Sequence, residues 1–238
     1  MEMRFRIFRF DPQLDKEPSY KVYTVSVDPA ERILDCLNRI KWEQDGTLGY
    51  RMSCAHGVCG SDGMRINGVC ALACQKLVRD YAGLDEITLD PLPFFEVRKD
   101  LIVDMDDFLA RIDSMQPYLI AAEPAPEKEY TQSPEDHKKQ EDVIRCILCA
   151  CCTSSCPVMR ENPDYVGPAA LVWAYRFLYD SRDGRFSDRL KKLNEPNGVW
   201  PCENYFECTR VCPKGIPITK SINFMKREIK KALPDGSQ

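Results

Sequence analysis

The sequence predicts an α+β protein in two parts: a small mixed α/β unit followed by an all-α unit. Segments with strand-like alternation and a hairpin signal occur within the first hundred residues, whereas helical spacing of apolar residues dominates after about residue 104. Thirteen cysteines are grouped at short spacings along the 238 residues. The expected domains are 1–103 and 104–238, and each is long enough to bury a core.

The strands of the first part are indicated by alternation and turn chemistry. Residues 3–10 and 20–27 alternate between the two faces expected of half-buried strands and are rich in aromatic and β-branched side chains. Asn67–Gly68 is a strong signal for a tight hairpin turn. Residues 86–95 read as a last strand that is closed by its prolines.

One helix is expected between the second strand and the cysteine-containing loop. Asp28 is a good N-cap residue, Pro29 suits the first helical position, and Glu31 lies three residues after the cap. The resulting order is strand, strand, helix, cysteine loop, hairpin and strand. That is the order of a β-grasp ferredoxin domain.

The second part is expected to be helical. Residues 104–120, 167–180 and 218–233 have apolar residues at helical spacing. Residues 121–139 are polar and rich in proline, which predicts a loop.

Charge and hydropathy exclude several classes of function. The formal net charge of -4 argues against a nucleic-acid partner. No apolar run approaches the roughly 18 residues of a membrane span, and the first residues do not resemble a signal peptide. We therefore expect a protein that faces the cytosol and that can still bind to a membrane subunit.

The cysteines are better explained as metal ligands than as disulfides. They lie two or three residues apart, in a chain that is too long to need disulfide bonds and that lacks a secretory signal. Zinc is the next alternative, but zinc sites use isolated groups of four ligands, whereas these cysteines form a patterned series.

The first C-terminal run is the bacterial ferredoxin motif. Cys146, Cys149, Cys152 and Cys156–Pro157 have the spacing C-x2-C-x2-C-x3-C-P, in which the fourth cysteine binds the other cluster of a pair. Soft thiolate ligands are those that iron–sulfur clusters select.

The second run, residues 202–213, follows the same motif with Tyr205 in place of the second cysteine. The crossing rule then gives one full set of four thiolates, for [4Fe–4S], and one set of three. We expect the set of three to bind [3Fe–4S], although a [4Fe–4S] cluster with a non-thiolate ligand remains an alternative. The full set is Cys146, Cys149, Cys152 and Cys212, and the set of three is Cys156, Cys202 and Cys208.

The N-terminal cysteine loop fits a plant-type [2Fe–2S] site with one exception. Cys54, Cys59 and Cys74 match three ligand positions, and Asp62 stands where the remaining cysteine is expected. Three interpretations are open: Asp62 is a ligand, Asp62 is a turn residue, or Cys70 supplies the fourth thiolate.

The whole chain resembles one family, the iron–sulfur subunits of succinate dehydrogenase and quinol:fumarate reductase. The resemblance lies in "RMSCAHGVCGSDG", "ALAC", "DPLPFFEVRKDLIVDM", "CILCACCTSSCP", "NPDYVGPAAL", "YRFLYDSRD", "NGVW" and "VCPKGIP". Members of that family carry Cys or Asp at the position of Asp62. The resemblance therefore implies that Asp62 is a ligand, that Cys70 is not, and that the other two sets bind [4Fe–4S] and [3Fe–4S].

The resemblance also implies a function in electron transfer. It implies a flavoprotein partner that acts on succinate or fumarate at FAD, and a membrane anchor that binds quinone and can carry haem. The chain would relay single electrons between the two at the cytoplasmic face of the inner membrane, as a peripheral subunit. The alternative is the iron–sulfur subunit of another flavoprotein oxidoreductase.

Two positions depart from the ubiquinone-linked members of that family. Glu161 stands where they carry tryptophan, and Glu203 stands where they carry histidine. By the resemblance, Pro157, Glu161 and Glu203 lie at the quinone end of the subunit. Both acids can also be read as solvated surface residues, and the departures lead us to expect menaquinone, which would suit fumarate reduction.

Overall fold

The computed structural model describes residues 1–122 and 124–233. Residue 123, within the expected loop 121–139, and residues 234–238, at the end of the expected second domain, lie outside the described residues.

The chain divides into two compact units, and neither is continuous in sequence. The first comprises Met1–Met105 and Ile147–Ser155, and the second comprises Asp106–Cys146 and Cys156–Gln238. Most of the first C-terminal cysteine run therefore belongs to the unit that contains the N-terminal cysteine loop.

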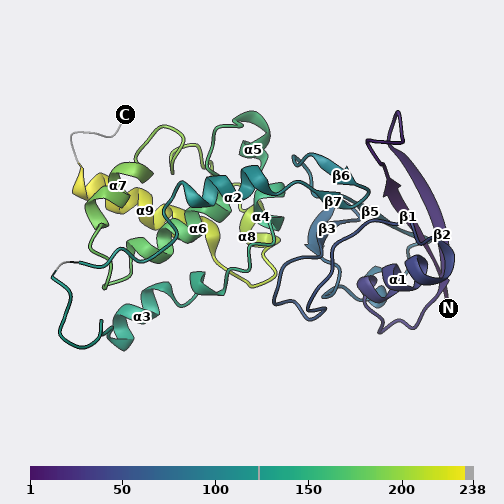
Figure 1. The fold of residues 1–238 in the computed structure, drawn as a ribbon, viewed down its shortest axis with the longest axis horizontal. Coiled ribbons are helices and arrows are strands. Elements are labelled where there is room, and N and C mark those ends of the chain that lie inside the picture. The colour runs from purple at the N-terminus through teal and green to yellow at the C-terminus, as the bar shows by residue number, and fades with distance from the viewer. Residues whose placement is uncertain (123, 234–238) are drawn as a thin grey trace. The chain divides into compact units, whose positions relative to one another are not determined.

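The first unit is built on a five-stranded sheet in the order β2-β1-β5-β3-β4 (Figure 1). β1 and β5 are parallel and the other neighbouring strands are antiparallel, which confirms the predicted strands and the hairpin at Asn67–Gly68. Alternate residues such as Phe5, Ile7, Ile87 and Leu89 are fully buried and form the core. The strands are β1 Glu2–Arg9, β2 Ser19–Ser26, β3 Gly63–Ile66, β4 Val69–Leu72 and β5 Glu86–Asp90, with a separate pair β6 Val97–Lys99 and β7 Ile102–Val103.

The predicted start of the first helix was wrong, although the predicted cap contacts are present. The Asp28 carboxylate accepts a hydrogen bond from the Ala30 N–H, and the Glu31 carboxylate accepts one from the Asp28 N–H. The helix α1 nevertheless begins at Ile33 and ends at Arg39. The backbone before it pairs with residues 76–79 instead, as in the bond from the Ile33 N–H to the Lys76 carbonyl (2.8 Å), and a paired segment cannot also continue a helix. The remaining helical segments of this unit are the π-helical turn Ile40–Gln44, the 3-10 turn Val78–Tyr81 and α4 Cys151–Ser154.

The described residues of the second unit form helices and loops, apart from one isolated bridge between Ala121 and Asp183. The two long helices expected at 167–180 and 218–233 are confirmed. Within residues 1–122 and 124–233, no helix is both long and apolar enough to cross a membrane. The helices are α2 Asp106–Asp113, α3 Pro134–Gln140, α5 Pro157–Glu161, α6 Gly167–Leu178, α7 Phe186–Leu193, α8 Glu207–Arg210 and α9 Ile218–Ala232, with a 3-10 turn at Val143–Arg145.

Two predictions for this unit need correction. The helix expected at 104–120 covers only Asp106–Asp113, because Gln116 adopts a left-handed conformation and precedes a proline, which disfavours helix in the residue before it. The segment 121–139, expected to be a loop, contains most of α3. Ser133 caps that helix by accepting a hydrogen bond from the Asp136 N–H (3.1 Å), with proline in the first turn.

A buried ion pair joins α7 to the loop that precedes it. Arg189 and Asp183 lie 2.7 Å apart, with side chains that are 3% and 1% exposed. Arg189 also donates to the backbone carbonyl groups of Met115, Gln116 and Tyr118. Burial opposes the ionisation of Asp183, but Arg189 and backbone N–H groups outweigh it and hold the pKa of that carboxyl below its usual value. The pair thus satisfies carbonyl groups that follow α2.

Candidate metal centres

The hairpin of β3 and β4 brings two parts of the N-terminal cysteine loop together. Asp62 directly precedes β3, and Cys74 comes shortly after β4. Because these strands are antiparallel neighbours, the segments that flank them meet at one end of the hairpin. The Asp62 carboxylate, 3% exposed, accepts a hydrogen bond from the Cys74 N–H at 2.5 Å. The structure therefore places Asp62 beside the predicted ligand Cys74.

Cys54 lies in a cradle of backbone N–H groups. His56, Val58 and Cys59 direct their N–H groups at the Cys54 Sγ, at 3.5, 3.4 and 3.3 Å. These donors, with that of His56 the strongest, lower the pKa of the Cys54 thiol to about 6. A metal ligand must be a thiolate, and the loop backbone stabilises that form.

Cys59 and Cys74 have different surroundings. The Ser61 hydroxyl donates to the Cys59 Sγ at 3.2 Å, a contact that the sequence analysis did not foresee although Ser61 lies only two residues away. Burial, together with the neighbouring Asp62 carboxylate, raises the pKa of the Cys74 thiol to about 12. A bound metal would reverse that preference, because its positive charge deprotonates a coordinating thiol.

The alternative ligand Cys70 faces other residues. It is 4% exposed on β4, and burial raises the pKa of its thiol. Its hydrogen-bond partner is Ser155, and its nearest thiols include Cys149 and Cys151. These contacts favour Asp62 over Cys70 as the fourth group of the N-terminal set.

A pH profile of thiol reactivity tests this electrostatic picture. In the cluster-free chain, we expect iodoacetamide to modify Cys54 with a rate that rises around pH 6 and then levels off, because the thiolate predominates above its pKa. Cys74 should stay protonated and unreactive up to strongly alkaline pH. Mass spectrometry of the alkylated peptides measures both profiles, and coincident profiles would contradict the assigned environments.

Three cysteines of the second unit line one pocket. Cys156 directly precedes α5, Cys208 lies on α8, and Cys202 lies on the loop before α8. The Thr219 hydroxyl lies 3.5 Å from the Cys208 Sγ. The sequence does not indicate this contact, because the two residues are eleven positions apart. The predicted set of three is thus brought together within this unit.

Tyr205 lines the same pocket, but its hydroxyl is bound by a neighbouring acid. Its side chain is 50% exposed, and its hydroxyl donates to the Glu203 carboxylate at 2.9 Å. This hydrogen bond, together with the nearby charges of Glu203 and Glu161, raises the pKa of the Tyr205 hydroxyl, so the phenol stays protonated. Three thiolates without a fourth donor fit a cluster that lacks one corner iron. Pro157 and Glu203 line the same pocket, and Glu161 ends α5.

The predicted [4Fe–4S] set is divided between the units. Cys149 and Cys152 belong to the first unit, and Cys146 and Cys212 to the second. Within the first unit, Cys149 accepts a hydrogen bond from the buried thiol of Cys151, and this contact lowers the pKa of Cys149 despite its burial. Cys151, expected to pack as a small apolar side chain, is fully buried and makes this contact as well.

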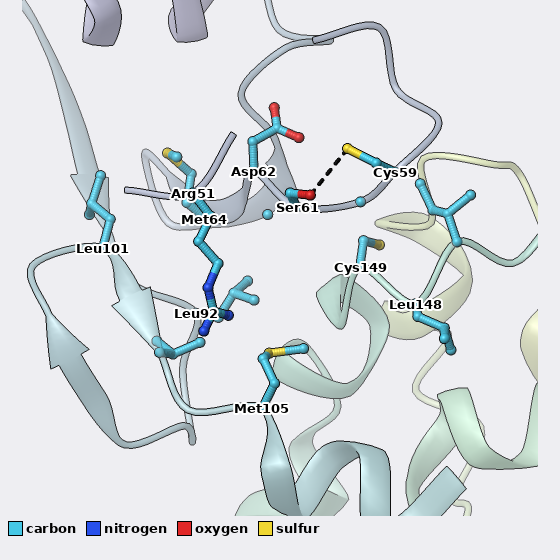
Figure 2. A pocket seen from close by; sticks show the side chains of 14 residues that line it. Arg51, Cys59, Ser61, Asp62, Met64, Leu92, Leu101, Met105, Leu148 and Cys149 are labelled. Atoms are coloured by element: carbon cyan, nitrogen blue, oxygen red, sulfur yellow. Dashed lines mark hydrogen bonds between the residues drawn. The ribbon is translucent and has the colours of Figure 1, made fainter. Parts of the chain in front are cut away.

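A pocket of about 320 Å³ on the first unit is lined by both cysteine segments of that unit. Figure 2 shows the side chains that line it. Cys59 and Asp62 come from the N-terminal loop, and Cys149 comes from the first C-terminal run. Leu92, Leu101 and other apolar side chains form much of the remaining wall. The two ligand segments therefore share one apolar surface.

Comparison with known proteins identifies the family. The succinate dehydrogenase iron–sulfur subunit of Coxiella burnetii is 42% identical over 237 residues, which cover 98% of this chain and 100% of that protein. The corresponding subunit of Paracoccus denitrificans is 43% identical over 229 residues, covering 94% and 86%. This chain belongs to the succinate dehydrogenase iron–sulfur subunits. The family recognised in the sequence is thereby confirmed.

Two domain families match this succinate dehydrogenase subunit. The 2Fe-2S iron-sulfur cluster binding domain matches residues 4–110, and the 4Fe-4S dicluster domain matches residues 142–216. They confirm the predicted α+β class, with a [2Fe–2S] β-sheet domain followed by a helical domain for two clusters.

Solved structures agree with this fold. A chain of the Mycobacterium smegmatis Sdh1 complex in the apo form superimposes with a TM-score of 0.90 at 26% identity, covering 98% of both chains. A hypothetical protein from Helicobacter pylori matches 94% of this chain and 39% of its own length, with a TM-score of 0.59 at 19% identity, which is a likeness of fold alone.

Proposed function

We propose that this iron–sulfur subunit relays single electrons between the FAD of a flavoprotein subunit and a quinone held by a membrane anchor, which can also carry haem. The observation that carries the proposal is the match to succinate dehydrogenase iron–sulfur subunits and to two cluster-binding domain families, on a chain with three predicted ligand sets. Iron–sulfur clusters supply one-electron chemistry, whereas a flavin exchanges electron pairs with its substrate. The complex would act at the cytoplasmic face of the inner membrane.

The ligand assignment follows from the residues described above. Backbone N–H groups hold Cys54 as a thiolate, and Asp62 and Cys74 lie together at the end of the hairpin. The pocket of three cysteines, with the Tyr205 hydroxyl bound to Glu203, supports a [3Fe–4S] site in preference to a fourth non-thiolate ligand. The ligands are Cys54, Cys59, Asp62 and Cys74 for [2Fe–2S]; Cys146, Cys149, Cys152 and Cys212 for [4Fe–4S]; and Cys156, Cys202 and Cys208 for [3Fe–4S].

The acids at the proposed quinone end support a menaquinone-linked enzyme. Glu161 and Glu203 are both exposed near Tyr205, in place of the tryptophan and histidine of ubiquinone-linked relatives. Such an enzyme would suit fumarate reduction. If the purified complex reduced ubiquinone analogues as well as naphthoquinones, the menaquinone assignment would be wrong.

Electron paramagnetic resonance of the purified complex, with iron and sulfide analysis, tests the proposed function. We expect three cluster signals, one of which, from [3Fe–4S], is present only in the oxidised protein. A colourless protein that contains zinc and no sulfide would refute the electron-transfer function.

Substitutions at position 62 test the fourth [2Fe–2S] ligand. An Asp62→Cys variant should keep the [2Fe–2S] signal and shift its midpoint potential, because a softer ligand replaces a carboxylate. Redox titration followed by electron paramagnetic resonance measures that potential. An unchanged spectrum and potential would make Asp62 a turn residue.

Cys70→Ala is the matched control for the competing ligand. We expect the [2Fe–2S] signal and its potential to be retained, since the Cys70 thiol faces Ser155 rather than the N-terminal loop. Loss of that signal in Cys70→Ala would reassign the fourth ligand to Cys70.

A further inference from the structure

Two predicted ligand segments of the first unit lie in direct backbone contact. The short stretch between Cys59 and β3 lines one pocket together with Cys149, and Figure 2 shows Ser61 and Asp62 of this stretch and Cys149 on the wall of that pocket. A Cβ atom on Gly60 would lie 2.6 Å from the Ile147 carbonyl oxygen and 3.0 Å from the Cys149 Cβ. The backbone at Gly60 therefore lies closer to residues 147–149 than it could if position 60 carried a side chain.

Gly63 makes a second contact of the same kind. A Cβ atom there would lie 2.8 Å from the Cys149 carbonyl oxygen. At each glycine the nearest atom is a backbone carbonyl oxygen, which cannot swing aside as the end of a long side chain can. Gly60 in the loop and Gly63 at the start of β3 thus lack the Cβ atoms that would push this segment away from Ile147 and Cys149.

We propose that Gly60 and Gly63 are positioning residues that hold the [2Fe–2S] loop against Cys149, and that the electron passing between the [2Fe–2S] and [4Fe–4S] centres crosses this contact. The inference rests on the proposed function. One electron is lost by one centre and gained by the other, and no bond is made or broken. Electron tunnelling weakens steeply with distance. A methyl group added at either position would increase the distance between the two centres and would therefore slow the electron transfer.

The chain offers matched controls for both glycines. Gly60 has φ +72°, and Gly83 has φ +88° with no atom within 4 Å of an added Cβ, so Gly83→Ala carries the same backbone strain without the contact. Gly63 has no left-handed φ, and Gly46 shares that property, with its nearest atom 3.9 Å away. Gly46→Ala is therefore the control for Gly63→Ala.

The test measures the magnetic interaction between the two clusters in the assembled complex. After full reduction with dithionite, a nearby [4Fe–4S] centre speeds the relaxation of the [2Fe–2S] signal, so this signal needs high microwave power to saturate. We expect Gly60→Ala and Gly63→Ala to lose part of this enhancement and to saturate at lower power. Gly83→Ala and Gly46→Ala should saturate as the unsubstituted complex does.

Only molecules that carry the [2Fe–2S] cluster contribute to its signal. Because loss of the [4Fe–4S] cluster would also remove the enhancement, the variants are compared at the iron and sulfide content of the unsubstituted complex. If Gly60→Ala does not load, Gly63→Ala decides the question, since its backbone angles suit any residue. Unchanged saturation in Gly63→Ala would overturn the inference. Absence of either cluster signal from the unsubstituted complex would instead refute the proposed function.

Discussion

Replacing Tyr205 with cysteine should convert the proposed three-iron centre into a four-iron centre. Position 205 is where the bacterial ferredoxin motif places its second cysteine, and the substitution would complete the set of Cys156, Cys202 and Cys208 with a fourth thiolate. We expect the signal of the oxidised [3Fe–4S] centre to disappear and the iron content to rise. Electron paramagnetic resonance of the oxidised complex, with iron analysis, measures both.

Phe206→Cys is the control for this substitution. Phe206 is 57% exposed and directly follows Tyr205, so its replacement adds a thiol one residue away from the motif position. It should leave the three-iron signal intact. A three-iron signal that persists in Tyr205→Cys would contradict the assignment of position 205 as the missing fourth ligand position of this set.

Replacing Arg189 with alanine should remove about 3–5 kcal/mol from the free energy of unfolding. The substitution leaves Asp183 buried and charged without its partner, and it removes the donors to three carbonyl groups that follow α2. Urea-induced unfolding followed by circular dichroism measures this loss.

Arg185→Ala is the matched control on the same loop. Arg185 pairs with Asp188 at 3.2 Å, and both side chains are more than half exposed. Exposed pairs contribute about 0–1 kcal/mol, so this variant should unfold almost as the unsubstituted protein does. If both variants lost the same free energy of unfolding, the buried pair of Arg189 and Asp183 would stabilise the protein no more than the exposed pair does.

The elements with strong local signals were predictable. Strand alternation and Asn67–Gly68 identified β1 to β5, and apolar spacing identified α6 and α9. The start of α1 could not be predicted, because the backbone after Asp28 forms hydrogen bonds with residues 76–79, which are distant in the sequence. α3 was not predicted, because the polar composition of this segment favours a loop. Ser133 is nevertheless a typical N-cap residue, and it marks the start of this helix in the sequence.

The sequence predicts which residues form each ligand set, but it does not predict the hydrogen-bond donors that surround those ligands. Motif spacing identifies which cysteines form the run, since spacing is a property of the sequence. The N–H cradle of Cys54 depends on backbone conformation, and the hydroxyl of Thr219 reaches Cys208 only through the packing of α9 beside α8. The hydrogen bond from Tyr205 to Glu203 likewise depends on a loop conformation that motif spacing does not encode.

The discontinuity of the first unit has a consequence for its biosynthesis. Met1–Met105 is translated first, but the segment Ile147–Ser155 that completes the unit leaves the ribosome only after residues 106–146. At about 5–20 residues per second, that delay lasts a few seconds. During this interval the nascent chain can pair its sheet, but Gly60 and Gly63 still lack the backbone of Cys149 against which they pack. The surface around Gly60 and Gly63 therefore stays uncovered in the nascent N-terminal domain until residues 147–155 have been synthesised.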